Sequence, residues 1–311
     1  ISPQYGGTFL DCTFGQGGYT KKILEFKNTK VIAIDRDNYT NKFAQEIKKK
    51  YPNRFHFYNK KFSKIGEINS KEKFRCIIFD LGYSMIQIKD KSRGLSFNSI
   101  GKLNMSMGLN NFSAHEVIHN LDLVDLIKIF KFFGEDKEAK IIAKKIINLR
   151  KKKIINNQDL ITIIESSKKK TFKKNKATKI FQSLRIFVNK EISELMKGLV
   201  EASKLLEPGG KIVVVSFHSI EDRIVKYFFN DLSKEKNLSR YLPRDTTDNR
   251  IFKIDKKKPI IPSLKEIEIN PASRSAKLRF ASKLRNVNGL EKKFIDKFKL
   301  LLEVENLSKK I

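Results

Sequence analysis

The sequence has few of the features that mark disulfide-rich, zinc-binding or membrane-spanning proteins. Its 311 residues include no tryptophan, seven prolines and only two cysteines. Cys12 and Cys76 fall in or beside predicted buried strands without metal-ligand spacing, so we expect free thiols, a reducing cytoplasmic location and no metal site. No apolar run reaches the roughly eighteen residues that a membrane-spanning helix needs, and we expect no membrane partner.

Acidic residues are also scarce. The chain has 34 Asp and Glu against 65 Lys and Arg, which gives a formal net charge of +31. Such an excess suits a polyanionic partner, because each cation placed near a phosphate releases counterions. The abundance of Lys, Ile, Asn and Phe is also what AT-rich coding gives to any protein. The lysine-rich run over 168–176 is therefore open to two interpretations, a solvated charge run or a phosphate-contacting arm.

The segment FLDCTFGQGGY, over 9–19, has the pattern of a strand, a glycine-rich turn and the start of a helix. Its apolar run ends in Asp11, and a helix-like segment begins at Thr20. The turn contains three glycines, Gly15, Gly17 and Gly18. Glycines let the backbone approach a ligand closely. The pattern predicts a cradle for a nucleotide-like cofactor.

A second apolar run, Val31–Ile34, ends in Asp35. A carboxylate at the tip of a second strand can accept both hydroxyls of a ribose, so the pair of motifs favours an adenosine-containing cofactor. The spacing G-x-G-G differs from the dinucleotide pattern G-x-G-x-x-G, which makes a nicotinamide-dependent oxidoreductase the least favoured class. Asp11 is more typical of methyltransferases, where an acidic residue lies near the methionine amino group of S-adenosylmethionine.

Strand and helix patterns alternate through residue 82 and predict a parallel sheet with helices on both faces. The predicted strands cover 8–13, 31–35, 55–58 and 76–81. A glycine-containing loop over 83–108 and helices over 113–170 follow, with Ser113 and Glu116 forming a capping box. One long helix over 177–206, a strand over 211–216, a helix near Ser219 and a last strand over 279–283 complete the pattern. We expect an α/β domain, residues 1–108 and 178–311, interrupted by a helical insertion, residues 109–177.

Several motifs together resemble one known family from end to end. They are DCTFGQGGYTKKIL, AIDRD, FDLGYSMIQI, RGLSF, GEDKEAKIIAKKI, FQSLRIFVNKEISEL, LLEPGGKIVVVSFHSIEDRIVK and NPASRSAKLR. The family is the RsmH/MraW group of small-subunit (16S) rRNA cytidine N(4)-methyltransferases. The resemblance implies a Rossmann-like S-adenosylmethionine-dependent domain with an inserted all-helical domain that meets the RNA. It also implies methylation of a cytidine in the decoding region of the rRNA of the small ribosomal subunit.

Carried over by position, the resemblance implies a set of cofactor contacts: Gly17, Gly18, Tyr19, Asp35, Phe62, Asp80 and Gln87. Asp80 and His218 follow predicted strands at the sheet edge where the reaction would take place, and they are the catalytic candidates. The target base would have to leave its stack to enter such a site. The candidates for RNA contact are Arg93, Arg223, Arg274 and Lys277.

The chain departs from the family pattern at four places, one of which is Asn-Lys-Ala-Thr-Lys over 175–179 instead of His-Pro-Ala-Thr-Arg. Tyr19 stands where the family has His, and Leu103–Met107 reads Leu-Asn-Met-Ser-Met instead of Leu-Asp-Met-Arg-Met. The family's N-terminal His-x-Pro-Val segment is missing, so we expect an incomplete start. Two alternatives stay open: an amino-methyltransferase acting on DNA or another RNA, and a non-catalytic rRNA-binding assembly factor that retains the fold. The second is motivated by the exchange of acid and base at Asn104 and Ser106.

Overall fold

The computed structural model describes residues 1–68, 73–99, 101–168, 176–234, 250–286, 289 and 291–311. By packing, the chain divides into two compact units. The sheet unit consists of Ile1–Gly82 and Glu194–Lys297, and the helical unit of Tyr83–Ser193 and Phe298–Ile311. Residues 83–108, 178–193 and 298–311 therefore group with the helices, whereas the sequence placed them with the α/β domain. The reason is that these segments pack on one another, as shown below.

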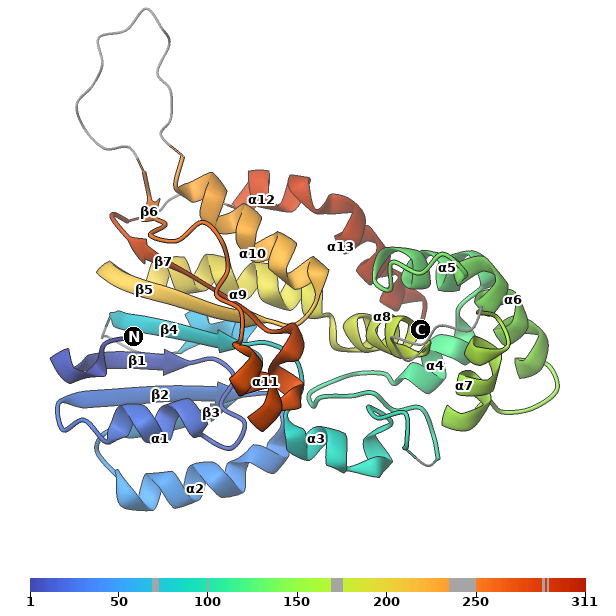
Figure 1. The fold of residues 1–311 in the computed structure, drawn as a ribbon, viewed down its shortest axis with the longest axis horizontal. Coiled ribbons are helices and arrows are strands. Elements are labelled where there is room, and N and C mark those ends of the chain that lie inside the picture. The colour runs from blue at the N-terminus through green and yellow to red at the C-terminus, as the bar shows by residue number, and fades with distance from the viewer. Residues whose placement is uncertain (69–72, 100, 169–175, 235–249, 287–288, 290) are drawn as a thin grey trace, which may run out of the picture. The chain divides into compact units, whose positions relative to one another are not determined.

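The sheet unit contains a seven-stranded sheet in the order β3-β2-β1-β4-β5-β7-β6 (Figure 1). The strands are β1 (Gly7–Asp11), β2 (Thr29–Asp35), β3 (Phe55–Asn59), β4 (Phe74–Asp80), β5 (Leu206–Ser216), β6 (Phe252–Lys253) and β7 (Lys277–Lys283). The first five pair in parallel, while β7 runs antiparallel to β5 and β6. The α/β class and the first four strands are confirmed, with ends within two residues of the prediction.

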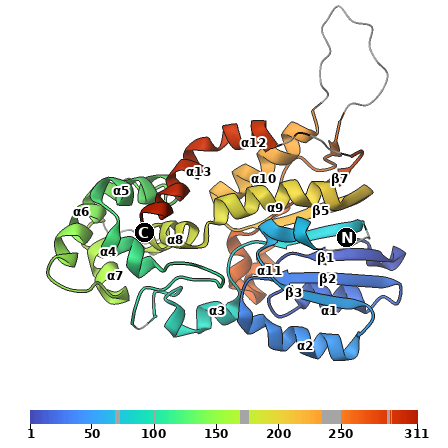
Figure 2. The same ribbon diagram turned by 180° about the vertical axis from the view of Figure 1, so that it is seen from behind.

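Helices cover both faces of this sheet, as predicted (Figures 1 and 2). Phe9, Val31 and Phe55 belong to the apolar core that α1 and α2 share with the sheet. Phe79 faces α9 instead, where the edge of its ring lies 3.3 Å from the Cβ position of Gly198. The helices of the unit are α1 (Gly18–Leu24), α2 (Asn41–Lys50), α9 (Glu191–Leu205), α10 (Ser219–Leu232), α11 (Leu264–Ile269) and α12 (Glu291–Lys297).

The helical unit has no strand among its described residues. Its helices are α3 (Met85–Lys89), α4 (Ala114–Asn120), α5 (Leu123–Phe132), α6 (Ala139–Arg150), α7 (Asn157–Glu165), α8 (Thr178–Asn189) and α13 (Lys299–Glu305). The capping box of Ser113 and Glu116 is confirmed at the start of α4. Short 3-10 turns occur at Pro3–Tyr5, Asn38–Thr40, Phe62–Glu67, Lys91–Arg93, Pro271–Ser275 and Asn306–Lys310. None of the described helices in either unit is long and apolar enough to cross a membrane.

The prediction of one continuous helix over 177–206 is wrong. Lys190 adopts a left-handed backbone conformation (φ 52°) that ends α8, and α9 begins at the next residue. Arg185 stabilises the break, because its guanidinium donates two hydrogen bonds of 2.8 Å to the Glu191 carboxylate. Residues 208–210, expected to end the helix before the strand, already belong to β5, and the short β6 was not expected. Residues 169–175 of the lysine-rich run lie outside the described residues.

Candidate active site

Three carboxylates lie at the carboxyl ends of neighbouring parallel strands. Asp11 ends β1, Asp35 ends β2 and Asp80 ends β4. Carboxyl ends of parallel strands meet at one edge of a sheet, the usual location of ligand sites in such folds. Burial raises the pKa of each of the three to about 6. In a chain of net charge +31, this edge is a local concentration of negative charge.

Asp35 fixes the glycine turn to the end of β2. Its carboxylate oxygens accept the backbone N–H groups of Gly15 at 2.7 Å and of Asp37 at 2.8 Å. Each carboxylate oxygen can accept a second hydrogen bond. The predicted role of Asp35, to hold two ribose hydroxyls, is therefore compatible with the contacts that it already makes.

The glycines of the turn serve different purposes. Gly17 has φ 76°, and a Cβ there would lie 2.6 Å from the Ile47 side chain and 2.8 Å from the Phe14 ring, so only glycine fits. Gly18 begins α1 with an ordinary helical backbone, and beyond its chain neighbours and its own helix backbone no atom of the described residues lies within 4 Å of its Cβ position. The space over Gly15 is open in the same way. Open space beside the turn is what a bound cofactor requires.

Asp80 carries an unsatisfied acceptor. Its backbone N–H donates to Thr13 Oγ1 at 2.7 Å, and its carboxylate accepts a hydrogen bond from the Tyr19 hydroxyl. The carboxylate oxygen Oδ1 is buried and has no hydrogen-bond partner among the described residues. Leaving a buried charged acceptor unpaired is unfavourable by about 1–3 kcal/mol or more. Such an atom at a strand end is therefore suited to receive a donor from a ligand.

The half-buried ring of Phe62 is held in position by its packing against Phe79 and Gly198. The ring packs edge-on against Phe79, with centroids 5.5 Å apart. The Cβ position of Gly198, on α9, lies only 2.7 Å from the Phe62 ring, so a side chain there would displace it. A ring held in this manner suits a flat ligand such as adenine.

Asp11 links the first turn of α1 to the end of β1. It is fully buried, and its carboxylate accepts the Thr20 hydroxyl at 2.7 Å and the Thr13 N–H at 3.3 Å. These contacts position the glycine turn. The expected place of Asp11 near the methionine amino group of the cofactor stays a prediction.

His218 is the N-cap residue of α10. Its Nδ1 accepts the backbone N–H of Glu221 at 3.4 Å, and its Nε2 lies 3.1 Å from the Glu221 carboxylate. The same carboxylate accepts the N–H of Phe217 at 2.9 Å. These contacts orient the start of α10, and a catalytic role of His218 stays a prediction.

The predicted RNA-contacting residues of the sheet unit differ in their surroundings. Arg274 is exposed in the turn Pro271–Ser275, and Arg223 is exposed on α10. Lys277 donates to Asp222 at 3.2 Å, beside a 2.7 Å bond from Arg279 to the same carboxylate. Although burial opposes it, these two cations hold the pKa of Asp222 below its usual value. The positive charge of Lys277 is therefore partly neutralised by the Asp222 carboxylate.

Gln87 and Arg93 belong to the helical unit, so their predicted roles stay predictions. Gln87 forms a capping box with Ser84 at the start of α3, and its Nε2 donates to the Met107 carbonyl at 3.5 Å. Arg93 pairs with Asp90 at 3.2 Å.

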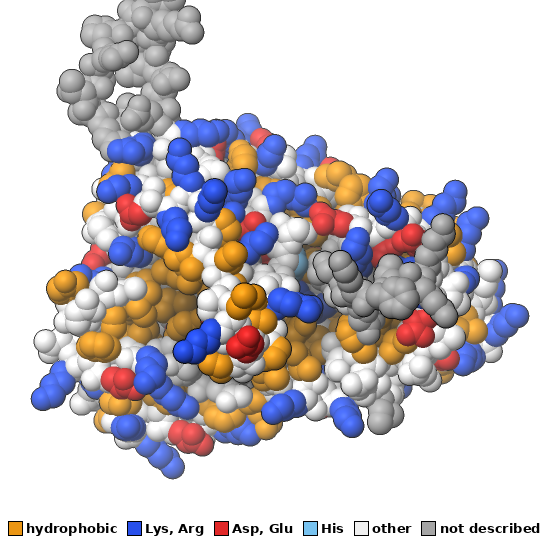
Figure 3. Space-filling view, viewed as in Figure 1, with side chains coloured by type: hydrophobic (Ala, Val, Ile, Leu, Met, Phe, Trp, Pro, Cys, Tyr) orange, Lys and Arg blue, Asp and Glu red, His pale blue; other side chains and the backbone are white. Residues whose placement is uncertain are grey.

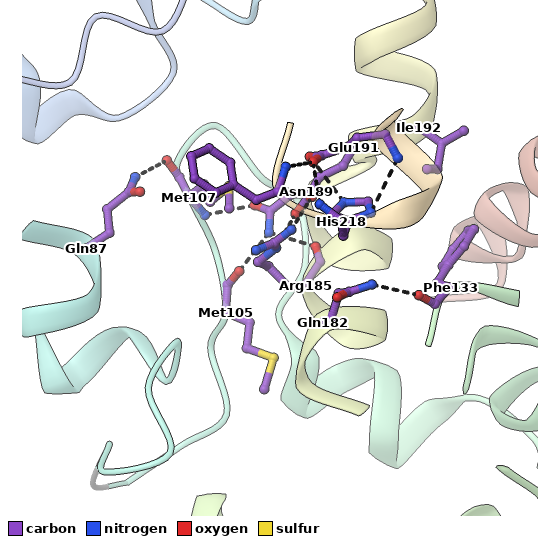
Figure 4. Close-up of polar contacts among 12 residues, drawn as sticks. Gln87, Met105, Met107, Phe133, Gln182, Arg185, Asn189, Glu191, Ile192 and His218 are labelled. Carbon is purple, nitrogen blue, oxygen red and sulfur yellow. Dashed lines mark hydrogen bonds and ion pairs between the residues drawn. The ribbon is translucent and has the colours of Figure 1, made fainter. Parts of the chain in front are cut away.

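Asn189 was missed by the sequence interpretation, yet it holds the loop of the helical unit together (Figure 4). Its Nδ2 donates to the Met105 carbonyl at 2.9 Å, and its Oδ1 accepts the Met107 N–H at 2.8 Å. Met105 is buried with φ 57°, a backbone strain typical of functional loops. The only signal for Asn189 in the sequence was its polar amide within the apolar stripe of the helix predicted over 177–206.

Asn104 and Ser106, the two departures from the family pattern, stabilise this loop locally. Asn104 Oδ1 accepts the Ser106 N–H at 3.2 Å, and Ser106 Oγ accepts the Gly108 N–H at 3.1 Å. The loop therefore keeps an ordered turn without the acid and the base of the family pattern.

Comparison with known proteins agrees with this geometry. The model of the MraW methylase family matches residues 1–284. A protein of Ehrlichia canis named ribosomal RNA small subunit methyltransferase H is 43% identical over 291 residues, covering 91% of this chain and 96% of its own. A protein of the same name from Rickettsia africae is 41% identical over 288 residues, covering 90% and 93%. The resemblance of the motifs is thus confirmed, and the chain belongs to the MraW methylase family.

Proposed function

We propose that this chain transfers a methyl group from S-adenosylmethionine to the exocyclic N4 of a cytidine in the small-subunit (16S) rRNA. Within the family, the observation that carries the proposal is the buried, unpaired Oδ1 of Asp80 at the sheet edge that also holds the open glycine turn. That edge offers both room for a nucleoside cofactor and an acceptor for an amine.

The residues present fit the cofactor. Asp35 has acceptor capacity for ribose hydroxyls, the open space over Gly15 and Gly18 gives room for the ligand, and the Phe62 ring is fixed by packing. We propose that the cofactor is held by Gly17, Gly18, Tyr19, Asp35, Phe62, Asp80 and Gln87. When bound, S-adenosylmethionine supplies an electrophilic methyl group on a positively charged sulfur.

The amine of cytosine is a poor nucleophile, since its lone pair is delocalised into the ring. In this proposal Oδ1 of Asp80, which is buried without a partner among the described residues, accepts one of its hydrogens, and this orients the nitrogen and helps it to rehybridise. With a pKa of about 6, Asp80 is ionised at neutral pH and opposes the positive charge that develops on the nitrogen. A strong base is not required, because the methylated amine loses its proton readily to water.

RNA contact is proposed for Arg93, Arg223, Arg274 and Lys277, and for the helical unit as the RNA-substrate domain. The net charge of +31 supports a polyanionic substrate, and Lys and Arg side chains are spread over the face in Figure 3. The small ribosomal subunit is the proposed partner, and the cytoplasm the proposed location.

The test is methyl transfer from labelled S-adenosylmethionine to three acceptors: small ribosomal subunits, free rRNA and DNA. We expect label in small-subunit rRNA and N(4)-methylated cytidine on nucleoside mass spectrometry. Label in DNA alone would favour the alternative amino-methyltransferase. Tight cofactor binding without transfer to any acceptor would favour a non-catalytic assembly factor.

Gly18→Ala separates a cofactor cradle from an ordinary turn. The free protein has room for the added methyl group, and alanine is the better helix former, so the free energy of unfolding is expected to stay equal or rise by up to about 1 kcal/mol. The same methyl group occupies space proposed for the ligand, so affinity for S-adenosylhomocysteine should fall about tenfold or more. Calorimetry and urea denaturation measure the two effects. Unchanged affinity would remove Gly18 from the site.

A further inference from the structure

A pocket of about 580 Å³ lies in the sheet unit beyond the carboxyl end of β5. One wall is Phe217 with the start of α10, a second is α11, and the third is the turn that carries Arg274 and leads to Lys277. Its volume is within the range of about 300–1,000 Å³ that is typical of small-ligand sites.

The α11 wall exposes apolar side chains. None of its residues is buried, and Leu264 is 81% exposed. Ile261, in the segment before the helix, is 67% exposed and also lines the pocket. Apolar side chains gather around this region of the face in Figure 3, with Lys and Arg side chains beside them. Exposed apolar surface next to a pocket is typical of a binding site.

The charge of the lining selects the ligand. Arg274 contributes an exposed cation and Lys277 a cation that pairs with Asp222, and no acidic side chain lines the pocket among the described residues. An apolar slot that includes the Phe217 ring suits the face of a base. An exposed guanidinium at its side suits a phosphate. Together they fit a single nucleotide.

The pocket adjoins the proposed site of methyl transfer. The Phe217 ring lies 3.7 Å from the Cβ position of Gly82, two residues after Asp80. The N–H of Leu81 donates to the Val215 carbonyl at 2.9 Å, which holds the ends of β4 and β5 together. The pocket is therefore close to the strand end that carries Asp80.

We infer that this pocket receives the target cytidine after it leaves its stack, with the base against Phe217 and Leu264 and a phosphate at Arg274. Entry of the base would cover the apolar side chains that α11 leaves exposed, which offsets part of the cost of unstacking. That the bound nucleotide is the one methylated rests on the proposed function.

The natural lack of tryptophan provides a direct test. I261W places a single fluorophore at the pocket, and I269W places one at the end of α11, at a 78% exposed position outside the lining. We expect a short cytidine-containing single-stranded RNA to quench I261W saturably and I269W little. No quenching of I261W, or equal quenching of both variants, would overturn the pocket assignment.

A second pair of variants tests the phosphate contact in catalysis. R274Q is expected to raise KM for small ribosomal subunits about tenfold or more, with affinity for S-adenosylhomocysteine within twofold of wild type. Lys265→Gln, which removes a cation outside the lining, serves as the control and should change KM little. Wild-type kinetics in R274Q would contradict the proposal. Quenching of I261W without any N(4)-methylated cytidine from the wild type would instead reject the proposed function.

Discussion

Asp80→Asn is expected to lower kcat/KM for methyl transfer by about 100- to 1,000-fold. Asparagine keeps the shape and one acceptor but removes the negative charge, which matters most when the attacking nitrogen becomes positive. The backbone bond from Asp80 to Thr13 is unaffected, so the fold should persist. Single-turnover kinetics with small ribosomal subunits measures the effect.

A matched control is Asp231→Asn, which removes a carboxylate that pairs with exposed Lys293 at 2.7 Å on the same unit. It should retain kcat/KM within about twofold, because exposed ion pairs contribute little. Equal activities of Asp80→Asn and the control would exclude a role for the Asp80 charge.

The pH profile gives an independent check on Asp80. Its pKa is raised to about 6, chiefly by burial, and the active form is the carboxylate. The kcat/KM should therefore be level above pH 6 and fall as the pH drops below it. Asp35 has a pKa of about 6 as well. The slope of log kcat/KM against pH should therefore correspond to the uptake of more than one proton in the wild type, and of one proton fewer in Asp80→Asn. Identical slopes would contradict this assignment.

Asp35→Ala is expected to lower affinity for S-adenosylhomocysteine by about 100-fold or more. Two hydrogen bonds from ribose hydroxyls to a carboxylate contribute about 1.5–3 kcal/mol each, and their loss accounts for this factor. The variant also leaves the N–H groups of Gly15 and Asp37 without their acceptor, which loosens the turn. Titration calorimetry measures the affinity.

Asp35→Asn separates these two effects, because its amide oxygen can still accept one backbone N–H. The pKa of Asp35 in the folded chain is above its ordinary value of 3.8, so its ionisation opposes folding: the stabilising contribution is full below about pH 4 and is lost as the pH rises through 6. At pH 7 Asp35→Asn should therefore unfold no more easily than wild type, yet bind the cofactor weakly. Wild-type affinity in both variants would remove Asp35 from the site.

The sequence predicted the parts of the fold that local pattern determines. Apolar runs such as Val31–Ile34 predicted the parallel strands. The carboxylates at the ends of such runs indicated Asp35 and Asp80 as candidate site residues. The glycine turn followed from the same logic, since Gly17 needs both a positive φ and the absence of a side chain.

Features that depend on distant contacts were not predictable. The apolar residues keep a helical spacing on both sides of Lys190, so the sequence predicted one continuous helix. The end of α8 is visible only in the structure, in the left-handed backbone of Lys190 and in the pairing of Arg185 with Glu191. The sequence also could not show that the Thr20 hydroxyl donates to the Asp11 carboxylate. The pocket beside α11 joins segments that lie far apart along the chain.

The three carboxylates at the strand ends give a strongly cationic protein one anionic edge of the sheet. A sulfonium donor carries one positive charge, whereas the thioether that remains after transfer carries none at sulfur. The negative charge at this edge therefore attracts the fresh donor more strongly than the spent one. This difference in attraction favours replacement of used by unused donor after each transfer.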